Sequence, residues 1–225
     1  MGPKKIMIIR HAEKPGVYNK VVYNGINPVG QYDVSSLVTM GWERAGGIAN
    51  LFSPTNGKFQ SPDLLTPNCI YASDPTPKVP AKYETDVHGN IIGSETSQRP
   101  YQTISALNAK LNFKVPVNLS FKAKDFDKMV KDVLKQDVPV VLIAWQHQDI
   151  LPHPNETPVI KKSILTEFLK ETKTTNLKNI PPGPWPPNRY DMVFVLDRPS
   201  GKGPFTSFKQ VPQMLLGGDV TALIS

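Results

Sequence analysis

The residues VPVVLIAW, at positions 138–145, form the stretch that decides the fold of this chain. The run is apolar nearly throughout, and the polar string QHQD follows it directly at positions 146–149. An uninterrupted apolar run of this length is typical of a strand that is covered on both faces, as in a parallel sheet. The stretch therefore predicts a central strand with helices packed on either side.

Shorter apolar runs on both sides of this stretch predict further strands. Residues 6–9 are apolar and stop at Arg10 and His11, and residues 68–73 (NCIYAS) form a second candidate. Nearer the C-terminus, residues 192–196 predict another strand and residues 208–216 predict an edge strand.

Apolar residues recur at helical spacing between the predicted strands. We expect one helix with Thr39 as its cap, ending near Phe52, and another that starts at Pro100. Two more helices are expected over 125–134 and from 157–158 onward. The alternation predicts an α/β fold with a mainly parallel central sheet flanked by helices on both faces.

The chain of 225 residues suits a single domain spanning 1–225. Residues 74–98 are rich in Pro, Gly, Thr and Ser and predict a long loop inserted in that domain. Residues 181–187, PPGPWPP, predict a stiff linker before the last strands.

The net charge of +7 and the isoelectric point of about 9.4 favour an anionic partner. The lysines between Lys110 and Lys135 are scattered over polar faces and lack the interleaved aromatic residues that stack on bases. We therefore expect an anionic substrate and no binding of nucleic acid.

No apolar run approaches the ~18 residues of a membrane span, and the N-terminal residues MGPKKIMIIRHAEK do not resemble a signal peptide. A single cysteine, Cys69, excludes an internal disulfide and fits a reducing compartment. These features predict a soluble, cytoplasmic protein with no membrane partner.

Polar and charged side chains follow several of the predicted strands. Arg10 and His11 end the first strand, His147 follows the central strand, and the loop after residues 68–73 leads to Arg99 at the start of a helix. Ligands of open α/β sheets bind beyond the carboxyl ends of the strands. We therefore expect two histidines and two arginines in one pocket, with a helix N-terminus behind Arg99.

This combination suits transfer of a phosphoryl group through a covalent intermediate. A neutral imidazole of His11 would attack phosphorus, while the arginines bind the phosphoryl oxygens and disfavour the imidazolium form. The second histidine would donate a hydrogen bond to the same oxygens. A carboxylic acid would protonate the leaving alcohol and later take a proton from water.

Five blocks of the sequence resemble the histidine phosphatase (phosphoglycerate mutase-like) superfamily, in the order that the family has them. IMIIRHAEKP (6–15) resembles its Arg-His signature, and SSLVTMGWERAGGIANLF (35–52) resembles its Leu-Thr-x-x-Gly-x-x-Arg-Ala helix. IYAS (70–73), SQRPYQT (97–103) and VVLIAWQHQDI (140–150) resemble the second strand, the segment with the second pocket arginine and the strand that presents the second histidine. One Arg-His pair alone would be a weak signal, whereas five ordered blocks are specific.

The resemblance implies a phosphatase in which His11 is the phosphorylated nucleophile. Arg10, Arg99 and His147 would complete the phosphate pocket, where inorganic phosphate or sulfate would also bind, and neither a metal nor an organic cofactor is implied. The Ser and Asn that follow the nucleophile in mutases are absent from EKPGVYN (13–19). The expected reaction is therefore hydrolysis of a phosphomonoester.

The resemblance does not assign the general acid. The commonest branch has a Glu shortly after the second arginine, and the acid phosphatase branch has an Asp directly after the second histidine. Neither pattern occurs here, because no Glu follows Arg99 closely and Gln148 precedes Asp149. Glu13 and Asp149 are the candidates, and if neither serves, the proton comes from water, from the substrate or from a carboxylate of the 74–98 loop such as Glu84, Asp86 or Glu95.

Other interpretations stay open. Without an acid, the same fold would be a catalytically weak or inactive module that binds a phosphorylated ligand or partner. A metal hydrolase would use the four histidines, but no His-x-x-x-His or comparable spacing occurs. A serine or cysteine hydrolase lacks Gly-x-Ser-x-Gly, and Cys69 falls inside a predicted strand. We expect Arg44 to be structural and His88 and His153 to be ordinary loop residues.

Overall fold

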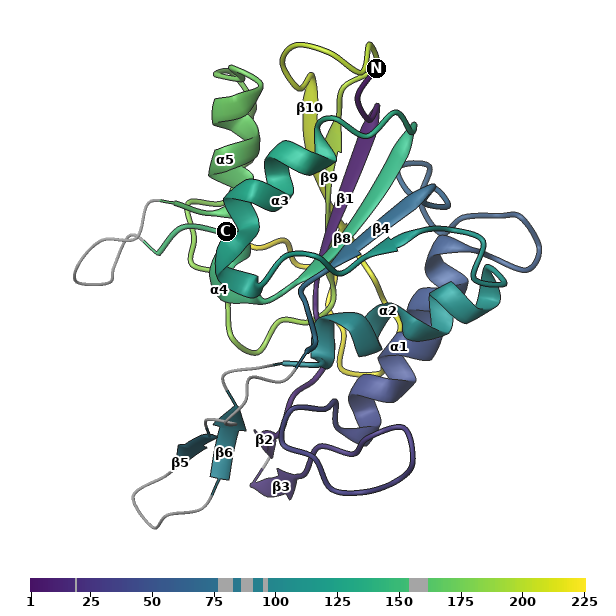
Figure 1. Ribbon diagram of the computed structural model, residues 1–225, viewed down its shortest axis with the longest axis vertical. Helices are drawn as coiled ribbons and strands as arrows, with labels where there is room; N and C mark the ends of the chain where they lie inside the picture. Colours follow the sequence, from purple (N-terminus) through teal and green to yellow (C-terminus); the bar gives the residue numbers. More distant parts are fainter. Residues whose placement is uncertain (19, 77–82, 86–90, 95–96, 154–161) are drawn as a thin grey trace.

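The computed structural model describes residues 1–18, 20–76, 83–85, 91–94, 97–153 and 162–225. Its centre is a six-stranded sheet with the strand order β10-β9-β1-β8-β4-β7 (Figure 1). In chain order these strands are β1 (Lys5–Arg10), β4 (Cys69–Ala72), β7 (Val117–Asn118), β8 (Val140–Trp145), β9 (Met192–Asp197) and β10 (Ser207–Pro212).

Four adjacent strands of this sheet, β1, β8, β4 and β7, run parallel. β8 pairs in parallel with β1 on one side and with β4 on the other, and β4 pairs in parallel with β7. β9 runs antiparallel to both β1 and the edge strand β10. The predicted α/β fold with a mainly parallel sheet is confirmed, and the 138–145 stretch supplies β8 in its interior.

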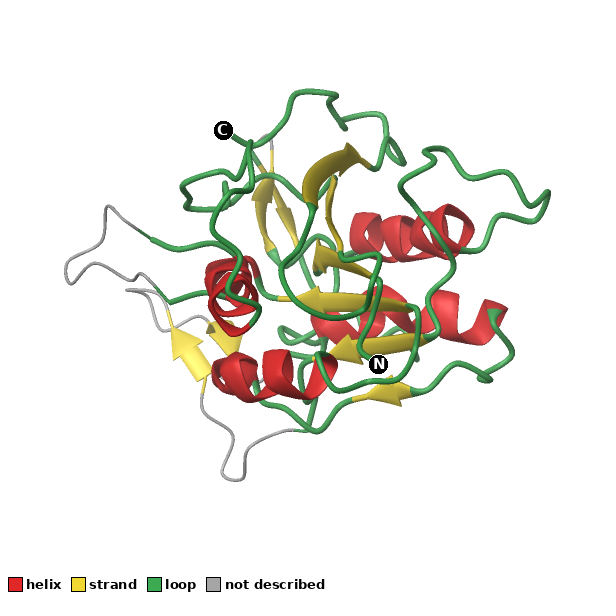
Figure 2. Cartoon of the chain, turned by 90° about the horizontal axis from the view of Figure 1, so that it is seen from above, coloured by secondary structure: helices red, strands yellow, loops and turns green. Residues whose placement is uncertain are grey.

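Helices cover both faces of the sheet (Figures 1 and 2). α1 (Thr39–Phe52) and α2 (Arg99–Lys110) pack on one face, and α3 (Phe126–Val133) and α5 (Ile164–Glu171) pack on the other. The alternation of side chains along β1 explains this arrangement. Ile6 and Ile8 pack with α3 and α5 on one face. Met7 and Ile9 pack with α1 and α2 on the other.

The remaining elements are short and lie mostly beside the carboxyl ends of the parallel strands. They are the hairpin β2–β3 (Gly16–Tyr18, Val21–Tyr23), the hairpin β5–β6 (Tyr83–Thr85, Ile91–Ser94), the 3-10 turn η1 (Ala123–Asp125) and the single turn α4 (His147–Ile150). The expectation that 74–98 forms only a loop is therefore wrong where it is described, because β5 and β6 pair within it. None of the described helices is long and apolar enough to cross a membrane.

Two predicted helix starts need correction. Thr39 is the first residue of α1 rather than its cap, since Val38 occupies the cap position and makes no side-chain capping bond. α2 starts at Arg99, one residue before the predicted Pro100. The predicted start of a helix at 157–158 lies outside the described residues.

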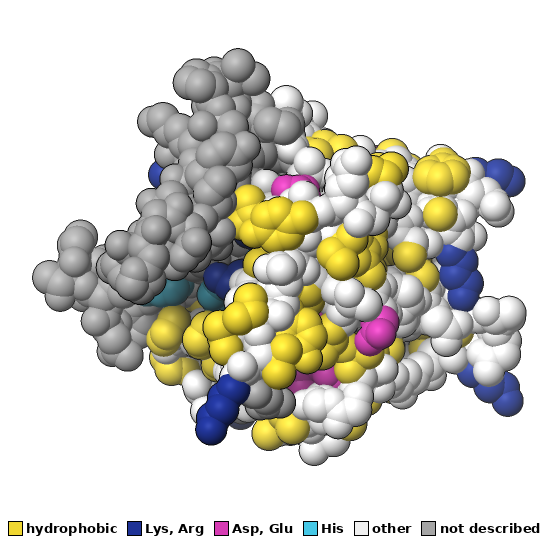
Figure 3. All heavy atoms as spheres, turned by 90° about the horizontal axis from the view of Figure 1, so that it is seen from below, with side chains coloured by type: hydrophobic (Ala, Val, Ile, Leu, Met, Phe, Trp, Pro, Cys, Tyr) yellow, Lys and Arg dark blue, Asp and Glu magenta, His cyan; other side chains and the backbone are white. Residues whose placement is uncertain are grey.

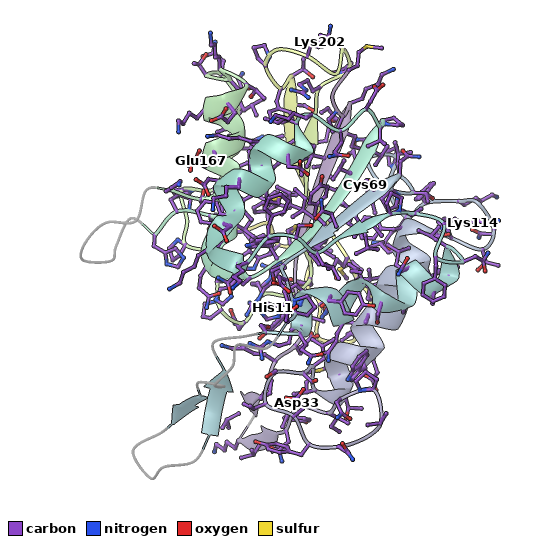
Figure 4. The ribbon with its side chains drawn as sticks, viewed as in Figure 1. His11, Asp33, Cys69, Lys114, Glu167 and Lys202 are labelled. Atoms are coloured by element: carbon purple, nitrogen blue, oxygen red, sulfur yellow. The ribbon has the colours of Figure 1, made fainter. Side chains whose placement is uncertain are left out.

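β1, β8 and β4 have their carboxyl ends on the same side of the sheet, because they are parallel neighbours in register. Arg10 lies opposite Trp145 on β8, and Ala72 of β4 lies opposite Ala144. His11 therefore lies at the carboxyl end of the parallel strands, whereas Lys202 lies at the opposite end of the sheet (Figure 4). An open α/β sheet binds its ligand beyond these carboxyl ends.

Candidate active site

His11 is held at the end of β1 by backbone hydrogen bonds to two neighbouring elements. Its N–H donates to the Trp145 carbonyl of β8 at 2.8 Å, and the next N–H, of Ala12, donates to Thr103 Oγ1 at 2.8 Å. The Thr103 hydroxyl in turn donates to the Arg99 carbonyl at 2.7 Å. The segment after β1 is thus tied both to β8 and to the first turn of α2.

The imidazole of His11 has a defined tautomer. Its Nδ1 lies 2.7 Å from the Ala12 carbonyl oxygen, which can only accept, so Nδ1 carries the hydrogen and Nε2 keeps a lone pair. The side chain is only 3% exposed. Burial, followed by the charges of Arg99 and Arg10, lowers the pKa of His11 well below its ordinary value, so the ring is neutral at neutral pH.

His147 lies beside His11, as predicted from the two strand ends. The two rings are 6.4 Å apart between centroids and stand edge to face at 79°. Burial, and then the charges of Arg10 and Lys14, lower the pKa of His147 to about 3. Its buried Nδ1 has no hydrogen-bond partner in the part of the chain that the structure describes.

Arg10 is fully buried beneath the segment that precedes β9. Its Nη1 donates to the carbonyl oxygens of Pro187 (2.7 Å), Arg189 (2.9 Å) and Pro186 (3.2 Å). Its Cζ lies 3.7 Å from the centroid of the Tyr190 ring. The centroid of the Tyr190 ring also lies 6.3 Å from the centroid of the His11 ring, so Tyr190 contacts both residues of the Arg-His pair.

Arg99 approaches from the start of α2. Its Nη1 donates to the Val34 carbonyl at 3.0 Å, and its charge is the largest electrostatic influence on the pKa of His11 after burial. The structure thus brings Arg10, His11, Arg99 and His147 together, from three different parts of the chain. Figure 3 shows histidine side chains beside a Lys or Arg side chain on the face seen from below.

Glu13 forms a buried ion pair that the sequence does not reveal. Both carboxylate oxygens accept hydrogen bonds from Arg44 of α1, at 2.8–3.1 Å. Arg44 also binds Asp219 near the C-terminus, at 2.6 and 3.0 Å, and all three side chains are at most 4% exposed. Burial alone would lower the pKa of Arg44, but the bonds to Asp219 and Glu13 raise it instead. Arg44 is therefore structural, as expected, and Glu13 shares that role.

Asp149 lies on α4, directly after His147 and Gln148. Its Oδ2 accepts hydrogen bonds from Gln146 Nε2 at 2.6 Å and from the Trp145 indole at 3.1 Å. Burial raises its pKa to about 6, against the opposing effect of these two bonds. The Asp149 carboxyl therefore keeps its proton to a higher pH than an ordinary aspartate does.

The other histidines and carboxylates do not form a metal centre in the described part of the chain. There, no group of three or more His, Cys, Asp or Glu side chains could hold a metal ion. His153 pairs through Nε2 with the Gln148 carbonyl at 3.0 Å. His88, Asp86 and Glu95 lie outside the described residues.

Sequence reasoning missed the part of the site that comes from the C-terminal third. Residues 181–187 were interpreted as a linker, yet the carbonyl groups at 186, 187 and 189 hold Arg10. Tyr190 carried no signal of its own, because a tyrosine next to a strand is usually a core residue. A buried Arg10 does require acceptors, and carbonyls of a proline-rich segment, whose prolines have no N–H, are suitable ones.

Comparison with known proteins gives a likeness in fold only. As a sequence, the chain matches no known family profile and no curated protein. One similar structure is assigned as the phosphohistidine phosphatase SixA from Agrobacterium tumefaciens, with 12% identity, a TM-score of 0.42 and coverage of 93% of this chain and 96% of that one. Another is the protein histidine phosphatase SixA complexed with tungstate, with the same identity and TM-score and coverage of 93% and 97%.

Proposed function

We propose that this chain is a phosphatase that hydrolyses a phosphomonoester through a phosphohistidine intermediate on His11. One observation carries the proposal: a buried and neutral His11, with a lone pair on Nε2, lies under the influence of two arginine charges and beside a second neutral histidine. These are the groups that in-line attack on a phosphate dianion requires. The five sequence blocks that resemble the superfamily support it.

The first half of the reaction transfers the phosphoryl group to the protein. Arg10 and Arg99 would neutralise the dianion, and the neutral His147 would donate its one N–H to a phosphoryl oxygen. Nε2 of His11 attacks phosphorus, the N–P bond forms, and the P–O bond to the alcohol breaks. The Ala12 carbonyl, which accepts from Nδ1, stabilises the positive charge that the ring gains.

The second half returns the protein to its starting state. A water molecule attacks phosphorus, the N–P bond breaks, and inorganic phosphate leaves. The acid that protonated the leaving alcohol in the first half takes the proton of this water. We assign the acid to Asp149, because burial raises its pKa to about 6, whereas both oxygens of Glu13 bind Arg44.

A binding module without turnover is the second candidate. It is favoured by the two hydrogen bonds that Asp149 Oδ2 already accepts, which hold the carboxylate on Trp145 and Gln146. Such a module would bind inorganic phosphate at the same residues but would release none from a phosphomonoester. Hydrolysis of p-nitrophenyl phosphate by the purified chain separates the two functions.

The test of the proposed function is His11→Ala, assayed on p-nitrophenyl phosphate and on a panel of alkyl phosphomonoesters. We expect no measurable turnover from a variant whose circular dichroism matches that of the unmodified chain. His153→Ala is the matched control, because it removes another largely buried imidazole outside the proposed machinery, and it should keep most of the activity. A well-folded His11→Ala protein with substantial activity would contradict the phosphohistidine mechanism.

A further inference from the structure

The strongest unexplained feature of the site is how Arg10 is held. A guanidinium that is removed from water costs several kcal/mol of folding free energy unless hydrogen bonds and favourable electrostatics replace the lost hydration. Here the side chain is fully buried, and three carbonyls of one chain segment accept from Nη1 alone. These bonds lie in the plane of the guanidinium, so the environment of its two faces depends on the side chains that pack against them.

Tyr190 packs against one of these faces. Its ring centroid lies 3.7 Å from Arg10 Cζ, which is within cation–π contact, and the side chain is only 5% exposed. The segment that carries the ring is itself fixed. The Trp185 indole donates to the Arg189 carbonyl at 2.8 Å, and the Arg189 guanidinium binds Asp191 at 2.7 Å.

We propose that Tyr190 is a positioning residue that fixes the guanidinium of Arg10 beside His11, so that the C-terminal segment 185–191 completes the phosphate site. Its ring covers one face of the guanidinium, while the three carbonyls of the same segment hold Nη1. The ring also contacts the imidazole of His11, at 6.3 Å between centroids. This inference rests on the proposed function for its effect on catalysis, but not for its effect on the electrostatics of the site.

The proposal predicts a measurable change at His11. The charged and titratable groups that face this ring are Arg10 from β1, Arg99 from α2 and His147 from α4, together with the Tyr190 ring. If Tyr190 is replaced by a side chain without a π face, Arg10 loses a favourable contact on its guanidinium, which can then shift away from His11, so its charge acts less strongly on that ring. The pKa of His11 should then rise toward its ordinary value, whereas Arg99 and burial continue to lower it.

The experiment compares Tyr190→Leu with Tyr190→Phe. NMR titration of the His11 ring protons reports its pKa, and calorimetry with inorganic phosphate reports the strength of anion binding. We expect Tyr190→Leu to raise the pKa of His11 and to weaken phosphate binding by roughly tenfold, or about 1.4 kcal/mol, which lies within the range of a desolvated cation–π contact. Tyr190→Phe keeps the ring and should match the unmodified chain in both measurements.

Two further variants keep the result interpretable. Phe208→Leu removes an aromatic ring from the same side of the molecule, where it packs on Phe194 rather than on Arg10, and should leave the pKa of His11 unchanged. Tyr190→Met, whose flexible side chain fills an irregular space more easily, replaces Tyr190→Leu if the latter does not fold. A rise in the His11 pKa that is equally large in Phe208→Leu would overturn the inference, as would a Tyr190→Leu or Tyr190→Met protein with an unchanged pKa.

Failure of the proposed function would look different. The unmodified chain would then neither bind inorganic phosphate nor release it from p-nitrophenyl phosphate, while the NMR titration of His11 would still report on Tyr190. If the unmodified chain is active and Tyr190→Leu retains both full phosphate affinity and the low His11 pKa, only the role of Tyr190 is refuted.

Discussion

Acidification should lower the free energy of unfolding of this protein, because two buried histidines are held in their neutral form. The pKa of both His11 and His147 is lower in the folded protein than in the unfolded chain, where it is about 6.5. Below that pH the unfolded chain binds protons that the folded site does not accept. The free energy of unfolding therefore falls as the pH drops below about 6.5.

The size of the effect follows from the linkage of proton binding to folding. The contribution of His147 to the free energy of unfolding falls by about 1.36 kcal/mol per pH unit, or roughly 2 kcal/mol between pH 6.5 and pH 5, and His11 adds a loss of the same sign. Asp149 acts with the opposite sign, because its pKa of about 6 means that the folded protein binds its proton first. Asp149 thus returns about 1.4 kcal/mol over the last unit, which offsets part of the loss from His147, and the loss from His11 adds to the remainder.

Urea denaturation at pH 7, 6 and 5, followed by circular dichroism, measures this loss, and two variants assign it. His147→Asn should reduce the difference between pH 7 and pH 5 by about 2 kcal/mol, while Asp149→Asn should increase it by about 1.4 kcal/mol. Other carboxylates add the same background to every protein, so the differences between variants are the informative quantities. If His147→Asn shows the pH dependence of the unmodified chain, His147 is not buried in its neutral form and the reasoning fails.

Two further predictions concern the carboxylates near the site. Arg44→Met leaves Glu13 and Asp219 buried without their common partner, so it should lower the free energy of unfolding by about 3–5 kcal/mol, as measured by urea denaturation; a loss below about 1 kcal/mol would show that the triad is not desolvated. Asp149→Asn should slow hydrolysis of alkyl phosphates by ~10²–10⁴-fold and that of p-nitrophenyl phosphate much less, because nitrophenolate leaves without a proton. An unchanged ratio of the two rates would exclude Asp149 as the acid.

The strands and their carboxyl ends were predictable from the sequence because each rests on a local pattern. A continuous apolar run identifies β8, and the polar residues that stop it place His147. The same reasoning places His11 after β1, and parallel pairing brings the two ends together. The direction of β9 was not predictable, because an apolar run has no polarity that would distinguish parallel from antiparallel pairing.

Contacts between distant segments were beyond such patterns. Arg10 and its carbonyl partners are separated by 176–179 residues, and Arg44 is 175 residues from Asp219. Prolines at 186 and 187 mark a turn-rich segment whatever it contacts, since their effect on the backbone is local. For the same reason, Glu13 could be interpreted as an acid until its partner on α1 was known.

The ion pair of Glu13 also bears on the charge of the site. Glu13 follows the nucleophile by two positions, so an unpaired carboxylate there would offset the arginine charge that a phosphate dianion needs. Arg44 binds this carboxylate through both oxygens and binds Asp219 as well. Burial, Arg99 and Arg10 lower the pKa of His11, whereas the hydrogen bond to the Ala12 carbonyl raises it. A structural arginine on α1 thus compensates the negative charge of Glu13, two residues after the nucleophile, and both anion binding and a neutral nucleophile are favoured when that charge is offset.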